Sequence, residues 1–476
     1  MAEGWVTVDH LGKIGVSVSV FLVITLTATL VVRGRRMGKE RTMERASSVF
    51  LFCLLVFTVF MLPLFSITGY AEEAVPPAGP EPSRRFLAIP YPFFNDTIGA
   101  GVGAVIITEG YIQPQVLTVT SVLGSVDGTY LGFFMMRNYQ VPWFRRVILE
   151  PQGSVGKFSD IKSYLRGNPA FPNERPGSNE SSEDNFLESD GDDFWVELTT
   201  KYLLPIGQGR ASVFPRLVLE NGIYVSGDTG GDTWNPFTSG RTYIEVTPFF
   251  RKQSLDDETG TLQKTAGIEM ALRYDNTDYR GNPTKGSYQR VFVNRDWGAL
   301  DSTAPYTSVG GEVAKFFSLG PSKHARQRTF AFNIWTSYCP TWDSSHTENG
   351  ETVFHRPPTY RGANLGGLFR LRGFPATRFY DQAAIYYGLE YRHTLRWNPL
   401  AERTWNGRLD VDWFQVVAFG ETGRVAPEWN LSTLHEDMKW SAGAGIRSMV
   451  NHVVIRVDLA ASSEDVIAQL FIGHPF

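Results

Sequence analysis

Apolar and polar residues alternate along most of the chain after residue 71, in segments of about ten residues that Gly, Asn, Asp and Pro separate. In residues 383–394, for example, Leu389 and Tyr391 share one face of an extended chain, while Glu390 and Arg392 share the other. Because successive side chains of a strand point to opposite faces of a sheet, a period of two predicts strands. No stretch after residue 71 keeps a helical period long enough to predict a helical domain.

About sixteen such segments can be counted, and an even number fits a closed antiparallel barrel, in which every backbone edge is paired. They lie near residues 98–108, 115–124, 128–137, 145–158, 192–204, 210–226, 240–252, 263–275, 286–297, 305–318, 326–338, 383–395, 408–420, 438–449, 452–460 and 466–475. The predicted fold class is all-β, a transmembrane antiparallel β-barrel of about 16 strands. Alternation alone does not exclude a soluble sandwich, which buries its apolar face instead of turning it to lipid.

One acidic stretch tests the parity of this count. Residues 166–193 are rich in Asp and Glu, and the long connections of outer-membrane barrels lie outside the cell. The sixteen segments place this stretch on the periplasmic side instead. We therefore expect one segment before residue 240 to be miscounted.

Two apolar stretches, 14–32 and 49–67, precede the alternating part of the chain. A basic cluster follows the first, and the small residues Gly69 and Ala71 follow the second, which is the pattern of a secretory signal peptide. The alternative is a pair of transmembrane helices, since each stretch approaches the length that spans a bilayer. We favour the signal peptide because everything downstream is typical of a barrel.

This interpretation divides the chain into three parts. They are a signal-peptide region (1–71), a short periplasmic linker (72–96) and an outer-membrane barrel (97–476). Residues 1–36 lie outside the protein in the alternative where translation starts at Met37 or Met43. The location predicted for the barrel is the outer membrane of a Gram-negative cell.

Charge and cysteine content exclude some classes of protein. The formal net charge is −4 and no basic block is present, so nucleic-acid binding is disfavoured. The two cysteines are Cys53 and Cys339, and cleavage after Ala71 would remove the first, so no internal disulfide is expected.

No motif indicates catalysis, a cofactor or a metal. Gly99–Ala104 matches the dinucleotide pattern G-x-G-x-x-A, but the residues after it predict a strand where that site needs a helix. The acidic runs 190–193 and 228–232 do not complete a calcium loop. The chain has no G-x-S-x-G, no H-E-x-x-H and no Cys/His cluster, so we expect a non-enzymatic protein without cofactor or metal.

The longest connection, about Tyr338 to Gln382, holds the sequence Leu371-Arg372-Gly373-Phe374. Long connections without secondary structure of their own are uncommon unless they are functional. We expect residues 359–382 to fold into the lumen, where an arginine needs a carboxylate partner.

Four patches of the sequence resemble the BamA/TamA superfamily of outer-membrane assembly barrels, also called bacterial surface antigens. The patches are 371–374 against the family's VRGF/Y loop tip, 274–286 against its RDNPFFPTRG turn, 419–423 against FxDxG, and 443–476 against the closing strands and the IGQxF ending. In that family the loop arginine packs inside the barrel against acidic residues. The matching positions are Arg372, with Glu421, where the family has Asp, and Glu390 as partners.

The resemblance implies a barrel that assists the insertion or translocation of polypeptide or lipid at the outer membrane. The family usually carries soluble periplasmic receptor modules, and the stretch between Ala71 and the first predicted strand is too short for one, so we expect a short member without them. The alternative function is a passive pore or structural barrel, as a monomer or a homodimer. The expected partners are outer-membrane lipids and the machinery that inserts the barrel itself, and not nucleic acid.

The mechanism implied is a weak seam between the first and last strands. We expect residues 99–108 to pair with 466–475, and the last strand to end at the C-terminal signal formed by Phe471 and Phe476. The glycines of the first predicted strand (Gly99, Gly101 and Gly103) would ease its curvature and weaken the seam.

The signal-peptide interpretation predicts cleavage after Ala71, because Gly69 and Ala71 supply small side chains behind an apolar core. Mass spectrometry of the protein from outer membranes should find a first peptide that begins at Glu72. Peptides from before residue 60 in the same material would contradict it.

Overall fold

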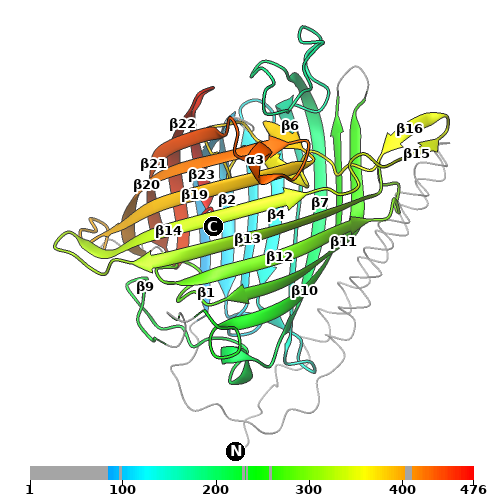
Figure 1. Ribbon diagram of the computed structural model, residues 1–476. Helices are drawn as coiled ribbons and strands as arrows, with labels where there is room; N and C mark the ends of the chain where they lie inside the picture. The colour runs from blue at the N-terminus through cyan, green and yellow to red at the C-terminus, as the bar shows by residue number, and fades with distance from the viewer. Residues whose placement is uncertain (1–83, 96–98, 228–230, 232–233, 257–259, 402–409) are drawn as a thin grey trace, which may run out of the picture. The chain divides into compact units, whose positions relative to one another are not determined.

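The structure is a computed structural model that describes residues 84–476, apart from 96–98, 228–230, 232–233, 257–259 and 402–409. The signal-peptide region, its cleavage point and the first part of the predicted linker lie outside the described residues. The described residues form one antiparallel sheet that curls into a nearly closed barrel (Figure 1). No helix in this part of the chain is long and apolar enough to cross a membrane.

The wall of the barrel has 16 strands, each paired with its neighbours in chain order. The strands are β1 (Arg85–Asn95), β2 (Gly99–Glu109), β3 (Leu117–Ser125), β4 (Tyr130–Arg137), β6 (Val147–Ser163), β7 (Leu187–Leu203), β10 (Arg241–Leu255), β11 (Leu262–Asp275), β12 (Gly286–Asp296), β13 (Tyr306–Ser318), β14 (Ala325–Tyr338), β19 (Ala383–Leu395), β20 (Val411–Ala426), β21 (Lys439–Val450), β22 (Val453–Ser462) and β23 (Val466–Ile472). The two-residue β5 (Tyr139–Gln140) continues β4 along β6. Short elements in the connections are η1 (Gly207–Arg210), β8 (Leu219–Glu220), β9 (Ile223–Tyr224), β15 (Ser345–Glu348), β16 (Glu351–Phe354), β17 (Ala363–Leu365), β18 (Phe379–Asp381) and α3 (Leu431–Leu434).

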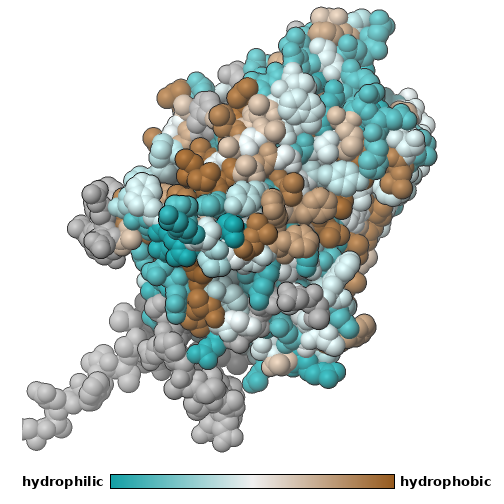
Figure 2. All heavy atoms as spheres, turned by 60° about the vertical axis from the view of Figure 1, so that its left-hand side comes forward, coloured by the Kyte–Doolittle hydropathy of each residue, from teal (hydrophilic) through white to brown (hydrophobic). Residues whose placement is uncertain are grey.

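The direction of the side chains decides between a sandwich and a membrane barrel. On β19, Leu389 is 48% exposed on the outside, while Glu390 beside it is fully buried. On β22, Val457 is 48% exposed and Arg456 is 1% exposed. Apolar side chains therefore face outward and charged ones inward, as in a membrane barrel. On the face in Figure 2, hydrophobic residues gather over the strands and hydrophilic ones gather toward the upper end.

All the predicted segments except 210–226 coincide with barrel strands. That segment is wrong: it belongs to the connection between β7 and β10, and only the short β8 and β9 lie in it. The missing strand is β1, which occupies part of the predicted linker 72–96. Because one strand was missed and one was added, the predicted number of strands is right. The side of the membrane assigned to the connections between β2 and β7 is reversed. The acidic connection 164–186 consequently lies at the same end as the long connection 339–382, here called the loop end.

Two prolines explain why β1 escaped detection, since proline argues against a strand. The ladder with β2 is continuous through Pro90 and Pro92, which pair with Ala104 and Val102. A proline has no N–H to donate, so these two residues cannot be the ones that bond to β2. Their nitrogens therefore face the free edge of β1, where proline is tolerated.

The glycines of β2 do not form the seam, because β2 lies between β1 and β3. Gly101 and Gly103 pair with Phe93 and Tyr91 of β1. A Cβ on Gly101 would lie 2.5 Å from the Phe93 ring, and one on Gly103 would lie 2.6 Å from the Tyr91 ring. These glycines make room for cross-strand aromatic rings, a packing that compensates for glycine in a sheet.

The predicted ladder between the first and last strands is also wrong. β1 and β23 lie beside each other, but among the described residues β1 pairs with β2, β23 pairs with β22, and no ladder joins β1 to β23. β23 ends at Ile472, and Gly473, with φ of 92°, turns the chain away from the strand direction. Phe476 then packs inside the barrel near Phe316 of β13, with ring centroids 6.5 Å apart, so it does not end the last strand.

The inner face of the first strands differs from the rest of the lumen. Leu87, Val105, Ile107 and Val119 form a buried apolar cluster on β1, β2 and β3. Partly buried apolar residues of the neighbouring elements pack against it, including Phe133 of β4. The wall formed by β1–β4 is thus apolar on its inner face as well as its outer face.

The end opposite the loop end is crossed by a hairpin. β8 and β9 are joined by Asn221 and Gly222, both with positive φ, as a tight hairpin turn requires. Trp413 of β20 donates its indole N–H to the Gly222 carbonyl at 3.1 Å. A Cβ on Gly222 would lie 2.6 Å from Asp412 Cβ, so this turn fits closely against the far wall. The connection from β7 to β10 therefore reaches across the lumen to β20.

The close packing of β2 between β1 and β3 predicts that Gly101→Ala destabilises the barrel. The new Cβ would lie 2.3 Å from the Gly124 carbonyl oxygen, and overpacking of this kind costs ~1–3 kcal/mol. The temperature at which the folded band disappears in detergent gels should fall. Gly420→Ala is the matched control, because nothing lies within 4 Å of its added Cβ. Equal effects of the two substitutions would contradict the proposed packing.

Candidate functional site

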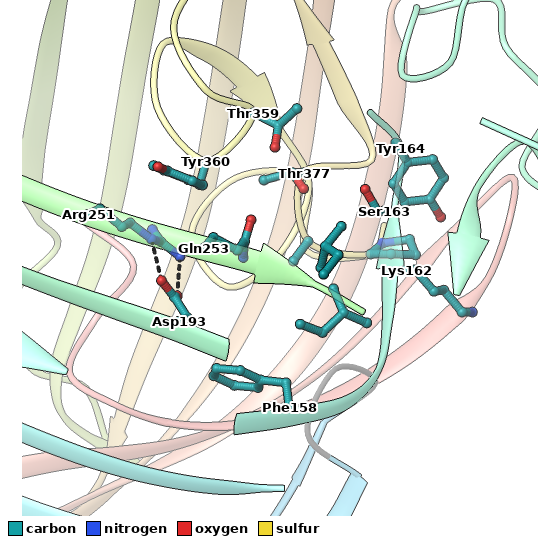
Figure 3. Close-up of a pocket in the computed structure, with 14 residues that line it drawn as sticks. Phe158, Lys162, Ser163, Tyr164, Asp193, Arg251, Gln253, Thr359, Tyr360 and Thr377 are labelled. Carbon is teal, nitrogen blue, oxygen red and sulfur yellow. Dashed lines mark hydrogen bonds and ion pairs between the residues drawn. The ribbon is translucent and has the colours of Figure 1, made fainter. Parts of the chain in front are cut away.

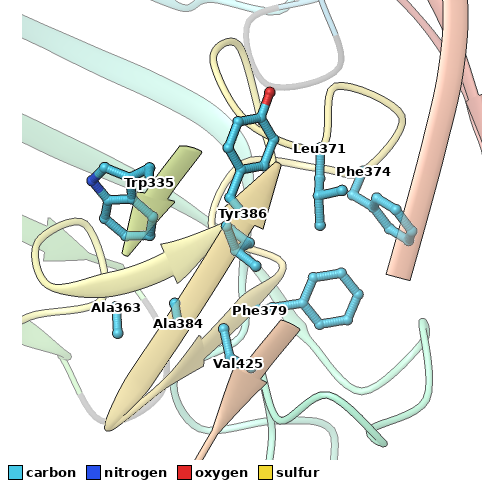
Figure 4. Packing of buried hydrophobic residues seen from close by; sticks show 9 residues of the cluster. Trp335, Ala363, Leu371, Phe374, Phe379, Ala384, Tyr386 and Val425 are labelled. Atoms are coloured by element: carbon cyan, nitrogen blue, oxygen red, sulfur yellow. The ribbon is translucent and has the colours of Figure 1, made fainter. Parts of the chain in front are cut away.

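The connection from β14 to β19 turns back into the barrel, and its residues 359–382 are called the lumen loop here. Before it, β15 and β16 form a small hairpin at the loop end. Within it, β17 pairs with β18 over three residues, which closes the lumen loop on itself. Figure 4 shows its apolar side: Leu371, Phe374 and Phe379 lie among Trp335 and Tyr386 of the wall.

Glycines shape the turn that presents the arginine. Gly366 has φ of 106°, and a Cβ there would lie 2.2 Å from the Pro375 carbonyl oxygen. Leu371 also has a positive φ of 54°, a conformation that costs energy for a side-chain-bearing residue. A Cβ on Gly373 would lie 2.9 Å from the Ala461 backbone, so only glycine fits beside β22. The turn is therefore held in this conformation by its contacts with the Pro375 carbonyl and with β22.

Arg372 lies inside the barrel with no exposed surface. Its Nε donates to Glu421 at 2.9 Å, and its backbone N–H donates to the other oxygen of that carboxylate at 2.7 Å. Its Nη1 lies 2.7 Å from Asp458 and 3.0 Å from Glu390. The guanidinium also stacks over the Phe419 ring at 3.5 Å. One side chain thus binds acids from β20, β19 and β22.

The three carboxylates have further partners that fix their positions. Glu421 accepts hydrogen bonds from the Tyr386 hydroxyl and the Ser441 hydroxyl, both at 2.8 Å. Glu390 accepts from Arg392 at 2.8 Å and from Arg447 at 2.7 Å. Buried acids with several hydrogen bonds keep one orientation.

Asp458 completes the cluster, because it also accepts from Arg456 at 2.8 Å. Arg456 in turn donates to the Leu368 carbonyl of the lumen loop at 2.6 Å. Gln469 of β23 donates to the Arg372 carbonyl at 3.2 Å, which ties the loop to the last strand.

The electrostatics of the cluster favour permanent charge on the loop arginine. Burial alone would lower the pKa of Arg372, but the carboxylates of Glu421, Glu390 and Asp458 raise that pKa above its ordinary value. The guanidinium therefore stays protonated at any physiological pH and cannot act as an acid or a base. What the arrangement can do is clamp the lumen loop to the wall of β19–β22.

The structure brings six of the residues singled out in the sequence into one place. They are Leu371, Arg372, Gly373, Phe374, Glu390 and Glu421. Gly99, Gly101, Gly103 and Phe476 lie elsewhere, on β2 and against β13. Phe471 packs its ring edge-on against Phe369 of the lumen loop, with centroids 5.3 Å apart.

Sequence reasoning missed Asp458 and the arginines around the acids. Period-two alternation does place Arg456 and Asp458 on the polar face of their strand, but it does not tell which strand faces the loop. Among the described residues, no three His, Cys, Asp or Glu side chains are grouped so that they could hold a metal ion.

Comparison with known proteins finds one matching family and several solved structures that are similar to this chain. A model of the Omp85 superfamily domain matches residues 223–470. No curated protein matches the chain. Similar solved structures include BamA from Haemophilus ducreyi lacking POTRA domains 1-3, at 12% identity with a TM-score of 0.42, where the match covers 82% of this chain and 69% of that one.

Two further similar structures are CdiB proteins. CdiB from Acinetobacter baumannii has 10% identity and a TM-score of 0.46, and the match covers 82% of this chain and 59% of that one. CdiB from Escherichia coli has 12% identity and a TM-score of 0.47, with 83% and 64% covered. The chain thus spans less than two thirds of the length of either CdiB.

The clamp predicts that Arg372→Ala destabilises the folded barrel, because removing one member of a buried ion pair costs ~3–5 kcal/mol. The folded band in detergent gels should disappear at a lower temperature. Arg372→Lys should recover only part of the loss, since one ammonium group cannot replace a guanidinium that contacts three acids.

Arg280→Ala is the matched control. Its side chain is 59% exposed and lies 3.5 Å from its acid partner, so the loss should be small. A folded-band temperature for Arg372→Ala equal to that of Arg280→Ala would show that the clamp does not stabilise the barrel.

Proposed function

Because this chain belongs to the Omp85 superfamily, we propose that it is a non-enzymatic barrel of the bacterial outer membrane that assists the insertion or translocation of polypeptide or lipid. One observation carries the proposal: the edges of β1 and β23 meet without a ladder. In lipid, an unpaired backbone group costs several kcal/mol, so such edges need a partner.

The prolines of β1 keep this seam from closing. The nitrogens of Pro90 and Pro92 face the free edge of β1, where they offer no donor to β23. β23 has no proline over its seven residues, so its edge keeps its donors and acceptors. The lumen loop holds β23 in place from within, through Gln469 and the Phe369–Phe471 contact. A held, unpaired edge is a template for an incoming strand.

A backbone edge favours polypeptide over lipid. Its row of N–H and C=O groups matches the row presented by another strand, as in recognition by strand addition. An acyl chain offers neither donor nor acceptor. We therefore propose that an extended polypeptide segment pairs with the edge of β23 during insertion, while lipid contacts the outer face of the wall.

The partners follow from the same proposal. They are outer-membrane lipids around the apolar belt, and an assembly machinery that inserts this barrel itself. The fit of the lumen loop in the interior argues against a permanently open pore, so the passive pore stays as the competing outcome of the test. Nucleic acid has no place in this proposal.

The test uses proteoliposomes that contain the full mature chain. A urea-unfolded small outer-membrane barrel is added, and its insertion is scored by protection from protease, while ion conductance is scored in the same preparation. Insertion above the rate in empty liposomes supports the proposal. Conductance without any gain in insertion would support the passive pore and end the proposal.

The seam is tested by Pro90→Thr combined with Pro92→Thr. This variant regains two N–H donors, and each new hydrogen bond is worth ~0.5–1.5 kcal/mol. The folded band should survive to a higher temperature, and insertion should slow because β1 now pairs with β23. Pro321→Thr, in the exposed turn between β13 and β14, is the control and should change neither. Faster or unchanged insertion in the double variant would count against the seam.

A further inference from the structure

Two histidines face each other on the β15–β16 hairpin, which projects from the barrel wall at the loop end (Figure 1). His346 Nδ1 lies 3.0 Å from His355 Nε2. The His346 side chain is 42% exposed, so solvent reaches the pair. Charged side chains of the barrel interior, in contrast, already bind one another, as Arg251 and Asp193 do beside the cavity in Figure 3.

The register of the hairpin explains this contact. His346 pairs with Val353, and the ladder continues to His355, whose backbone N–H donates to the opposite segment at 2.8 Å. Residues in this diagonal relation share one face of a hairpin, and ring side chains can reach across it. The strands are joined by Asn349 and Gly350, both with positive φ, as a tight two-residue turn requires. The hairpin therefore presents two imidazoles in a fixed relation.

The distance between the two ring nitrogens fits a shared metal ion. Imidazole nitrogens bind Zn²⁺ at ~2.0–2.1 Å, so two of them lie ~3.4 Å apart in tetrahedral coordination. Neighbouring nitrogens of a square-planar Cu²⁺ ion, with bonds of similar length, lie ~2.8–2.9 Å apart. The observed 3.0 Å falls between these two separations. Only a small rotation of the rings is therefore needed to admit an ion that both nitrogens bind.

Two carboxylates on the same face of the hairpin also indicate a cation. The second ring nitrogen of His346, Nε2, lies 3.8 Å from Glu348. Metal-binding histidines usually donate their second N–H to a carboxylate, which fixes the ring and makes the free nitrogen a better ligand. Glu351 is directly opposite Glu348 in the ladder, and like charges so placed destabilise a sheet. A cation bound beside these acids offsets their repulsion.

We infer that His346 and His355 form a binding site for a divalent transition-metal ion, with Glu348 as the positioning residue of His346. Imidazole suits Cu²⁺, Zn²⁺ and Ni²⁺, and Cu²⁺ binds most tightly in the order that such sites follow. Ca²⁺ and Mg²⁺ prefer oxygen ligands, so they do not compete. The protein supplies two ligands and water the rest, since no group of three such side chains occurs in the part of the chain that the structure describes.

A bound ion would join β15 to the residue that follows β16 and so close the base of the hairpin. That base is already attached to its surroundings. The His355 carbonyl accepts from the Thr341 hydroxyl at 2.8 Å, and Arg356 Nε donates to the Trp342 carbonyl at 3.0 Å. The inference holds whatever the barrel inserts or translocates, because the hairpin belongs neither to the seam nor to the lumen loop.

The test is a Cu²⁺ titration of the full mature chain, purified without a histidine tag and freed of metal by a chelator. Binding should saturate, and the electron paramagnetic resonance spectrum of the bound ion should show two nitrogen ligands. His346→Ala and His355→Ala should each abolish the two-nitrogen spectrum. Glu348→Ala should keep that spectrum but weaken binding about tenfold, as the loss of a carboxylate behind a ligand does. Ca²⁺ in excess should displace none of the copper.

His324→Ala is the matched control, because His324 is exposed in the turn between β13 and β14, and it should change neither the spectrum nor the affinity. The folded band in detergent gels shows that each variant is folded, since none of the substituted side chains belongs to the wall. Copper that binds His346→Ala as tightly as the unsubstituted protein would overturn the inference. So would a spectrum with one nitrogen ligand, or a titration that never saturates, because the two histidines would then only hydrogen-bond to each other.

Discussion

The burial of one guanidinium against three carboxylates is the interaction on which the rest of the structure depends. A fully buried arginine needs acids around it, and here Glu421, Glu390 and Asp458 come from three different strands. Their convergence sets the register of β19–β22 relative to the lumen loop. It also fixes the turn around Gly373, whose backbone touches β22. The position of β23 follows, because Gln469 binds the backbone of the same arginine.

The wall of the barrel could be predicted from the sequence because its signal is local. Whether a residue faces lipid or lumen depends on its place in a strand, so Leu389 and Glu390 are assigned by alternation alone. The pairing of Arg372 is different in kind. Two of its three acidic partners, Glu421 and Asp458, lie 49 and 86 residues away. The resemblance of short motifs pointed to Glu421 and Glu390, but nothing in the sequence pointed to Asp458. Arg361 of the lumen loop carries no motif. It contacts β7, β10, β11 and β12, which only the folded barrel brings together.

The two errors at the N-terminal side have one physical cause. Local rules treat proline as a strand breaker and an apolar run as a strand, but an edge strand tolerates proline on its open side. Pro90 and Pro92 therefore hid β1, while the apolar residues of 210–226 were counted although they serve the hairpin that crosses the lumen. The glycines of β2 were read as a weakness of the sheet, yet Gly101 and Gly103 are where aromatic rings of β1 fit.

The apolar inner face of β1–β4 makes the two flanks of the seam unequal in their tolerance of lipid. If the β19–β22 flank turned outward, it would carry Arg392, Arg447 and Arg456 toward the bilayer core, at ~2.5–3.5 kcal/mol for each arginine. The other flank would expose apolar side chains such as Val105, Ile107 and Val119. Moving these side chains from their present cluster to the acyl chains of lipid costs little free energy. Turning the inner face of β19–β22 toward lipid would therefore cost far more free energy than turning that of β1–β4, because only the former buries charged side chains.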